Sequence, residues 1–199
     1  MEAFKIKNGL SAKRYLGSNG IETAGSVGYS LAGASYDSKS FSVASQEGAA
    51  GGVQFKSDGT KLFTCGPVSD KIFSYDLSTA WDISTSSFVQ SFSVASQETN
   101  PIGLTFNTDG TKMYIVGFIN DTVYQYNLST GFNLSTASYG SVSFSVASQE
   151  TAPLSLTFNA DGTKMYIVGN TNDSVYQYSL STGFNVSTAS YDSVSFSVA

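Results

Sequence analysis

The sequence has no histidine, and its 199 residues include only one cysteine, three prolines and one arginine. The missing histidine removes the commonest general base and the commonest zinc ligand. A single cysteine, Cys65, excludes an internal disulfide framework. No run of about 18 apolar residues is present, so the sequence predicts no membrane insertion. The start, MEAFKIKNGLSAKRYLG, lacks the apolar region of a secretory signal.

Charged residues are also few, at 13% of the chain, and the formal net charge is −5. Nucleic acid binding requires a basic surface for the phosphates, so we expect no nucleic acid partner. The positive charge is concentrated in the first 16 residues, where Lys5, Lys7, Lys13 and Arg14 outnumber the single carboxylate, Glu2. The N-terminus is therefore chemically distinct from the acidic remainder.

Apolar residues make up 41% of the sequence and aromatic residues 14%, which is enough to build a core. The polar remainder is mostly Ser, Thr, Asn and Gly. This composition favours strands and tight turns over surface helices, which usually carry Lys, Glu and Arg.

An internal repeat organises most of the chain. The phrase SFSVASQE is complete at Ser40–Glu47, Ser91–Glu98 and Ser143–Glu150, and a shorter copy begins at Ser195. The last two units are identical at 42 of 52 positions, so each unit is expected to adopt one shape. Alignment on the phrase gives units at 41–91, 92–143 and 144–195, with a partial unit at 196–199.

Each unit contains four β-rich runs bounded by turn residues. In the third unit these are Val142–Val146, Leu154–Phe158, Lys164–Val168 and Ser174–Leu180. The segment NADGT between the second and third runs is typical of a type I turn followed by a left-handed glycine. The aspartates of these turns are interpreted as turn formers, because the ligand density of a calcium loop is absent. They are Asp58, Asp109 and Asp161.

Four antiparallel strands with short hairpins and a longer crossover are the plan of a β-propeller blade. The predicted fold is all-β, with three four-stranded antiparallel blades of 51–52 residues, the start of a fourth, and an irregular N-terminal arm. The arm spans 1–28 and the repeat region 29–199. In this interpretation SFSV is the first strand of its blade. Because propellers close with about four to eight blades, we expect part of a longer chain or a homo-oligomer, with an open stack as a further alternative.

Several repeated side chains have predicted structural roles. Cys65 aligns with Val116 and Val168 and is interpreted as a small buried hydrophobe. The paired aromatics of the fourth run are expected to pack between blades. Aromatics that follow LST are expected to anchor the crossover on a neighbouring blade, and the glutamates of SFSVASQE to fix a loop through backbone amides. The paired aromatics are Phe73, Tyr75, Tyr124, Tyr126, Tyr176 and Tyr178. The aromatics after LST are Trp81, Phe132 and Phe184, and the glutamates are Glu47, Glu98 and Glu150.

The unit SFSVASQETAPLSLTFNADGTKMYIVGNTNDSVYQYSLSTGFNVSTASYD resembles the β-propeller repeats of tail and other virion-associated proteins of bacteriophages, particularly those of marine bacteria. It is more distantly similar to YVTN/TolB-like propellers with a PDGTKLY hairpin. The opening FKIKNGLSAKRYLGSNG is similar to the N-terminal segment of such phage proteins, which joins an appendage to the particle. The resemblance implies a virion structural protein such as a tail fibre or tail-associated component, assembled in the host cytoplasm.

This interpretation assigns two sets of candidate contact residues. The arm has too little apolar surface to fold alone, so we expect it to dock on other virion proteins. Hairpin loops that vary between units are candidates for contact with a host-surface receptor or glycan. The docking candidates are Phe4, Ile6, Leu10, Arg14, Tyr15 and Leu16. The surface-contact candidates are Ser69, Asp70, Phe118, Asn120, Asp121, Asn170, Asn172 and Asp173.

No catalytic, cofactor or metal residues are predicted, and we expect no enzymatic activity. Recurring carboxylates at Asp70, Asp121 and Asp173 leave an acidic site open, although hairpin caps explain them more simply. The alternative to a virion protein is a cellular binding or scaffold propeller, or a surface adhesin. The fold does not decide between them.

Overall fold

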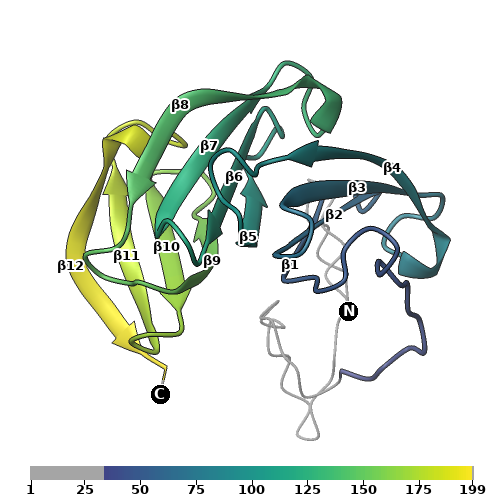
Figure 1. Ribbon diagram of the computed structural model, residues 1–199, viewed down its shortest axis with the longest axis horizontal. Coiled ribbons are helices and arrows are strands. Elements are labelled where there is room, and N and C mark those ends of the chain that lie inside the picture. The colour runs from purple at the N-terminus through teal and green to yellow at the C-terminus, as the bar shows by residue number, and fades with distance from the viewer. Residues whose placement is uncertain (1–33, 199) are drawn as a thin grey trace, which may run out of the picture. The chain divides into compact units, whose positions relative to one another are not determined.

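The computed structural model describes residues 34–198, and the residues from Lys39 onward form one compact unit. This unit contains three four-stranded sheets (Figure 1). The first comprises β1 (Gly52–Phe55), β2 (Lys61–Gly66), β3 (Lys71–Leu77) and β4 (Ser86–Ser93). The second comprises β5 (Pro101–Phe106), β6 (Lys112–Gly117), β7 (Thr122–Leu128) and β8 (Ala137–Ser145). The third comprises β9 (Pro153–Phe158), β10 (Lys164–Gly169), β11 (Ser174–Leu180) and β12 (Ala189–Ser197).

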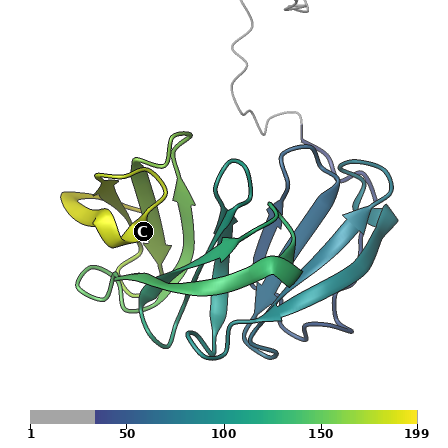
Figure 2. The same cartoon turned by 90° about the horizontal axis from the view of Figure 1, so that it is seen from above.

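Every sheet is an antiparallel meander in which consecutive strands pair. The innermost strands β1, β5 and β9 contact one another in sequence, and β4, β8 and β12 lie outermost (Figure 1). Seen from above, the sheets stand beside one another as successive layers (Figure 2). Each outermost strand is preceded by a short 3-10 helix, η1 (Ile83–Thr85), η2 (Leu134–Thr136) or η3 (Val186–Thr188). The predicted all-β fold with three four-stranded antiparallel sheets is confirmed.

The position of SFSV in the sheet was predicted wrongly. Its SFS part forms the end of the outermost strand of the preceding sheet, where Phe144 of β8 pairs with Val123 of β7. Likewise Phe196 of β12 pairs with Val175 of β11, so Ser195–Ser197 complete the third sheet and do not start a fourth blade. The strand begins as early as Ala137 or Ala189, in residues that the sequence suggested were crossover. Its largely exposed Ser-rich half has the composition of a loop, which explains the error.

The true connection between sheets is the short segment that follows each SFS. Val94 donates its N–H to the carbonyl of Asp70 at 2.9 Å, and its own carbonyl accepts from Gln97 and Glu98. The same bonds recur at Val146. SFSVASQE therefore closes one sheet and turns the chain into the innermost strand of the next.

Aromatic side chains pack the sheets against one another. Phe63 of β2 lies 4.6 Å from Phe106 of β5, centroid to centroid, and Tyr114 of β6 lies 4.6 Å from Phe158 of β9. In the outer layer, Phe92 and Phe144 meet the next sheet edge-on at Tyr126 and Tyr178. Tyr126 and Tyr178 thus pack between blades, as predicted.

Cys65 is fully buried within β2, next to the second sheet. Burial raises the pKa of its thiol to about 12, so the thiolate is not formed near neutral pH. The prediction of a small buried hydrophobe is confirmed.

The β1–β2, β5–β6 and β9–β10 hairpins have the predicted turn geometry. Asp58 accepts the backbone N–H of Thr60 at 3.0 Å, and the equivalent bonds form at Asp109 and Asp161. The next residue in each turn is a glycine with φ near +72°. Phe132 lies directly over Gly110 and 5.3 Å from Phe106 of its own sheet, and it reaches Phe63 of the first sheet at 6.2 Å. The rings of Trp81 and Phe184 instead pack on Phe55 and Phe158 of their own sheets, so the predicted anchoring on a neighbouring sheet holds for Phe132 only among these ring contacts.

Substituting Gly110 tests this packing. Gly110→Ala requires φ of +72° and places a Cβ 2.2 Å from the Phe132 ring, so we expect a loss of at least about 2 kcal/mol of unfolding free energy in urea denaturation. Gly48→Ala is the control, because its Cβ meets only Val68 methyls at 3.9 Å, and its effect should stay within about 0.5 kcal/mol. Equal effects of the two substitutions would contradict the packing described.

Candidate functional site

The most regular polar feature is a buried glutamate at the start of each sheet. Glu47, Glu98 and Glu150 are 2%, 0% and 0% exposed. Each lies under the hairpin that joins the second and third strands of the sheet it precedes, at residues 67–70, 118–121 and 170–173. We call this end of the sheets the hairpin end.

Glu47 shows the arrangement in full. Its carboxylate accepts the N–H of Ala49 at 3.0 Å, of Val68 at 3.2 Å and of Ser69 at 3.1 Å. The Ser69 hydroxyl adds a fourth bond at 2.5 Å. One buried carboxylate therefore replaces the backbone partners that a tight hairpin loop lacks.

Glu150 and Glu98 repeat the arrangement through backbone amides of the hairpin loop. Glu150 accepts from Ala152 at 2.9 Å, Thr171 at 3.0 Å and Asn172 at 3.4 Å. Glu98 accepts from the amides of residues 100, 119 and 120 at 2.8, 3.4 and 3.3 Å. The prediction that these glutamates fix a loop through backbone amides is confirmed.

Two effects act in opposite directions on the pKa of these carboxyls. Burial by itself raises the pKa of Glu47, but the bonds from Ser69, Ala49 and Val68 outweigh it and hold the pKa below the ordinary 4.5. In Glu150, burial is likewise outweighed by the amides of Ala152, Thr171 and Asn172. Both groups are therefore ionised at neutral pH.

Several predicted surface-contact residues use their side chains to hold the hairpins in place. Ser69 is bound to Glu47, as described above. Asn120 and Asn172 donate their side-chain amides to the carbonyls of Gln97 and Gln149, at 2.6 and 2.9 Å. Both asparagines nevertheless remain exposed, as does Asn170, whereas Phe118 is half-buried.

The three recurring aspartates close the hairpins through the backbone. Asp70, Asp121 and Asp173 have left-handed φ values of 54°, 46° and 44°. Their carbonyls accept the N–H of the valine that follows each outermost strand, at 2.9, 2.8 and 2.7 Å. Burial, and then the charge of Glu150, raise the pKa of Asp121. Each aspartate thus belongs to the hairpin of its own sheet.

In residues 34–198, no group of three or more His, Cys, Asp or Glu side chains is placed to hold a metal ion. The same residues include no helix with the length and apolar character needed to cross a membrane. The predicted docking residues Phe4, Ile6, Leu10, Arg14, Tyr15 and Leu16 lie outside the described part of the chain.

The hairpin tips carry exposed side chains inside the loops predicted for surface contact. Val68 is 67% exposed and Ile119 is 59% exposed, and Thr171 occupies the equivalent exposed position in the third sheet. Because the glutamate fixes the backbone beneath them, these three side chains are presented by rigid loops.

A cleft lies between the first and second sheets, at the end opposite the hairpin end. This cleft has a volume of about 500 Å³, and its lining includes Gln54, Phe55, Trp81, Phe106 and Phe132. Trp81 is 59% exposed and lies 5.3 Å from Phe55, centroid to centroid. Apolar walls with a few amide and hydroxyl groups suit a small, uncharged ligand.

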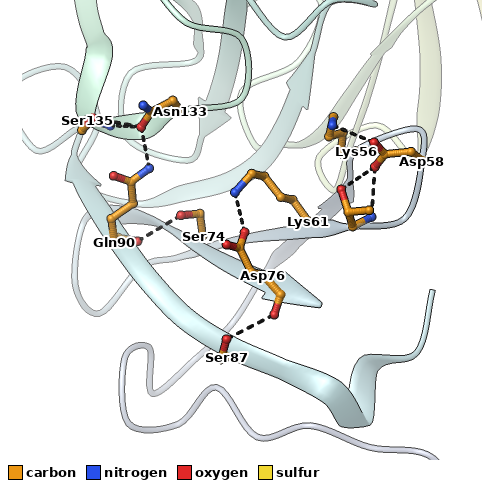
Figure 3. A network of polar contacts seen from close by, with 10 residues as sticks. Lys56, Asp58, Lys61, Ser74, Asp76, Ser87, Gln90, Asn133 and Ser135 are labelled. Atoms are coloured by element: carbon orange, nitrogen blue, oxygen red, sulfur yellow. Dashed lines mark hydrogen bonds and ion pairs between the residues drawn. The ribbon is translucent and has the colours of Figure 1, made fainter. Parts of the chain in front are cut away.

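The first sheet makes polar contacts both within itself and across to the second sheet (Figure 3). Lys61 pairs with Asp76 within the sheet, whereas Gln90 of β4 donates to Asn133 of the second sheet at 2.9 Å. Asn133 in turn caps η2 by accepting from Ser135. This contact between an outermost strand and the cap of the next 3-10 helix helps to define the junction of the first and second sheets.

Comparison with solved structures identifies the fold. A candidate 6-phosphogluconolactonase from Bacteroides fragilis is 19% identical with a TM-score of 0.53, over 71% of this chain and 40% of that chain. A Lactobacillus plantarum protein is 15% identical with a TM-score of 0.53, over 74% and 41%. A candidate 6-phosphogluconolactonase from Bacteroides uniformis is 15% identical with a TM-score of 0.52, over 71% and 39%. These neighbours are β-propellers, and the three sheets are blades of this fold.

The chain spans about two fifths of the length of these neighbours. No protein-family model matches the sequence, and none of the curated proteins matches it. At such low identity the likeness shows the fold alone.

Replacing Glu150 tests the role of the buried carboxylates. Glu150→Gln keeps one acceptor oxygen but turns an amide donor toward backbone N–H groups, so we expect a loss of about 1.5–3 kcal/mol in urea unfolding at pH 7. Asp173→Asn removes a nearby exposed carboxylate without removing a hydrogen-bond acceptor of the loop, and should change stability by less than about 0.5 kcal/mol.

The difference between wild type and Glu150→Gln should depend on pH. A carboxyl whose folded pKa lies below 4.5 stabilises fully above that value and loses its contribution as the pH falls through the folded pKa. The stability difference should therefore narrow below about pH 4.5. A difference that stays constant down to pH 2 would contradict this assignment.

Proposed function

We propose that the protein is a non-enzymatic structural component of a bacteriophage virion, a tail fibre or tail-associated protein. In this proposal residues 1–28 dock on other virion proteins and the propeller blades display the hairpin end for contact with a host-surface receptor or glycan. The supporting observation is the fixed backbone beneath Val68, Ile119 and Thr171, which differ in side chain while the glutamate beneath each is the same. The resemblance of the repeat to virion-associated propellers supports the same proposal.

The observed geometry suits display better than chemistry. Most polar groups of the hairpin end are bonded to backbone, and the variable side chains are presented from rigid hairpins. Interfaces of this kind depend on a few exposed anchors held in position by a scaffold. The similarity to candidate lactonases concerns the fold and supports no activity in this chain.

A cellular binding or scaffold propeller is the second candidate. The observation that favours it is the cleft between the first and second sheets, which lies away from the hairpin end. A small ligand in that cleft would contact Trp81 and Phe132, and it would leave the hairpin tips unused.

The display role predicts that the hairpin tips control adsorption. Particles carrying Val68→Asp, Ile119→Asp and Thr171→Asp together should adsorb to host cells at least about tenfold more slowly, because charge at a contact surface disrupts its anchors. The matched control is Thr79→Asp, Thr130→Asp and Thr182→Asp, three exposed residues at the other end of the sheets. Unchanged adsorption by the hairpin variant, with a normal amount of protein in the particles, would contradict the display role.

The docking role predicts that residues 1–28 are required for incorporation. Protein that lacks them should keep the β-sheet circular dichroism of the wild type, because all described strands begin after Lys39. It should be missing from purified particles when their proteins are separated by electrophoresis. Incorporation at the wild-type copy number would contradict the docking role.

A further inference from the structure

Residues 34–42 have the sequence of an outermost strand. ASYDSKSFS at 34–42 and ASYDSVSFS in β12 are identical at eight of nine positions, and they differ only at Lys39 and Val194. Ser38 has a φ of 61°, matching 59° at Ser193, which lies where the β11–β12 register shifts. Sequence and backbone therefore both match a bulged outermost strand, yet 34–42 form part of no strand among the described residues.

The end of this segment already occupies the junction position on the first sheet. Phe41 meets Tyr75 edge-on at 5.3 Å, just as Phe92 meets Tyr126 at 5.5 Å. The carbonyl of Val43 accepts from the amides of residues 46 and 47, both at 2.9 Å, as the equivalent valines do in later copies. Residues 40–47 thus lie where the outermost strand of a preceding blade would end.

An ion pair distinguishes this segment from β12. Lys39 contacts Asp82, the cap of η1, at 2.8 Å, and the equivalent junction contact in the next sheet is Gln90 to Asn133. β12 carries Val194 at the position of Lys39, so it has no cation for Asp82. Residues 34–42, rather than a copy of β12, are therefore suited to lie against the first sheet.

The third sheet presents a matching uncovered face. Tyr166 and Val168 are half-exposed, whereas their equivalents Tyr114 and Val116 are fully buried under the third sheet. Within the described residues, β12 is the most exposed of the outermost strands, and Phe196 is 71% exposed. Its second half is held by its pairing with β11 and is covered by no other sheet in that part of the chain.

We propose that residues 34–42 of one copy pair with β11 of a second copy in the place of β12. The register of β12 then sets Phe41 opposite Val175 and Ser35 opposite Ser179. The exchange releases β12 from β11 and replaces that pairing by an equivalent one, while it newly buries Tyr166 and Val168 of one copy against the first sheet of the other. Each copy is then both donor and acceptor, as in other exchanges of an identical element between copies.

One aligned residue of the innermost strand distinguishes the junction between copies from the two junctions between sheets of one chain. A Cβ at Gly52 would lie 2.5 Å from the Ile102 carbonyl, and one at Gly103 would lie 3.0 Å from the Leu154 carbonyl. The third sheet has Ser155 at this position, so its neighbour must stand a few tenths of an ångström further away. The association of copies is therefore weaker than the packing within one chain.

Cysteine trapping tests the proposed pairing in the full chain. In a Cys65→Val background, which removes the native thiol, Ser35→Cys with Ser179→Cys should form disulfide-linked dimers on mild oxidation and non-reducing electrophoresis. Ser179→Cys with Ser190→Cys is the matched control, because these residues pair in a chain whose β12 keeps its place on β11, and there they should give a bond inside one chain. The proposal is overturned if the control closes while the 35/179 protein stays monomeric, with its thiols free or joined within one chain.

Solution association without any cross-link gives a second test. Sedimentation should show a concentration-dependent dimer whose dissociation constant falls severalfold in Ser155→Gly, which allows closer approach, and rises in Phe41→Ala. A protein that stays monomeric at 100 μM (about the weak end of specific association) in both wild type and Ser155→Gly would overturn the proposal.

Discussion

The bond between a buried glutamate and the amides of a hairpin loop is the contact on which the remainder of each blade depends. The carboxylate of Glu47, Glu98 or Glu150 arrives from the connection before the sheet and binds the hairpin between its second and third strands. An uncompensated charge could not be buried at this position, so amides and carboxylate require each other. The contact fixes where the chain enters the sheet and holds the hairpin tips that we propose for receptor contact.

The SFSVASQE phrase joins this contact to the packing between blades. Its phenylalanine packs on a tyrosine of the next sheet, its valine closes the preceding hairpin, and its glutamate fixes the following one. One phrase therefore makes contacts in two consecutive sheets. Residues 40–47 keep the phrase, with Phe41 packed on Tyr75 and Glu47 bound to the first hairpin.

Much of this organisation could be predicted from the sequence, and the failures have physical causes. The turns at Asp58, the burial of Cys65 and the role of the glutamates follow from local chemistry and recurrence, and the structure confirms them. The position of SFSV could not be read this way, because an antiparallel strand pairs equally well with an earlier or a later neighbour. The strong exposure of Val68 and Ile119 within the predicted contact loops could not be read from the sequence either, because exposure depends on packing that the repeat pattern does not specify.

Amide hydrogen exchange, followed residue by residue in NMR spectra of the unmodified protein, measures the glutamate contact most directly. The account predicts that the loop amides of Ser69, Asn120 and Asn172 exchange far more slowly than exposed amides near neutral pH, although they lie outside any strand ladder. It also predicts that the exposed loop amide of Thr79, which is bonded only to the Thr85 hydroxyl, exchanges faster than they do. Exchange of the three hairpin amides at the rate of an unstructured peptide would contradict the account.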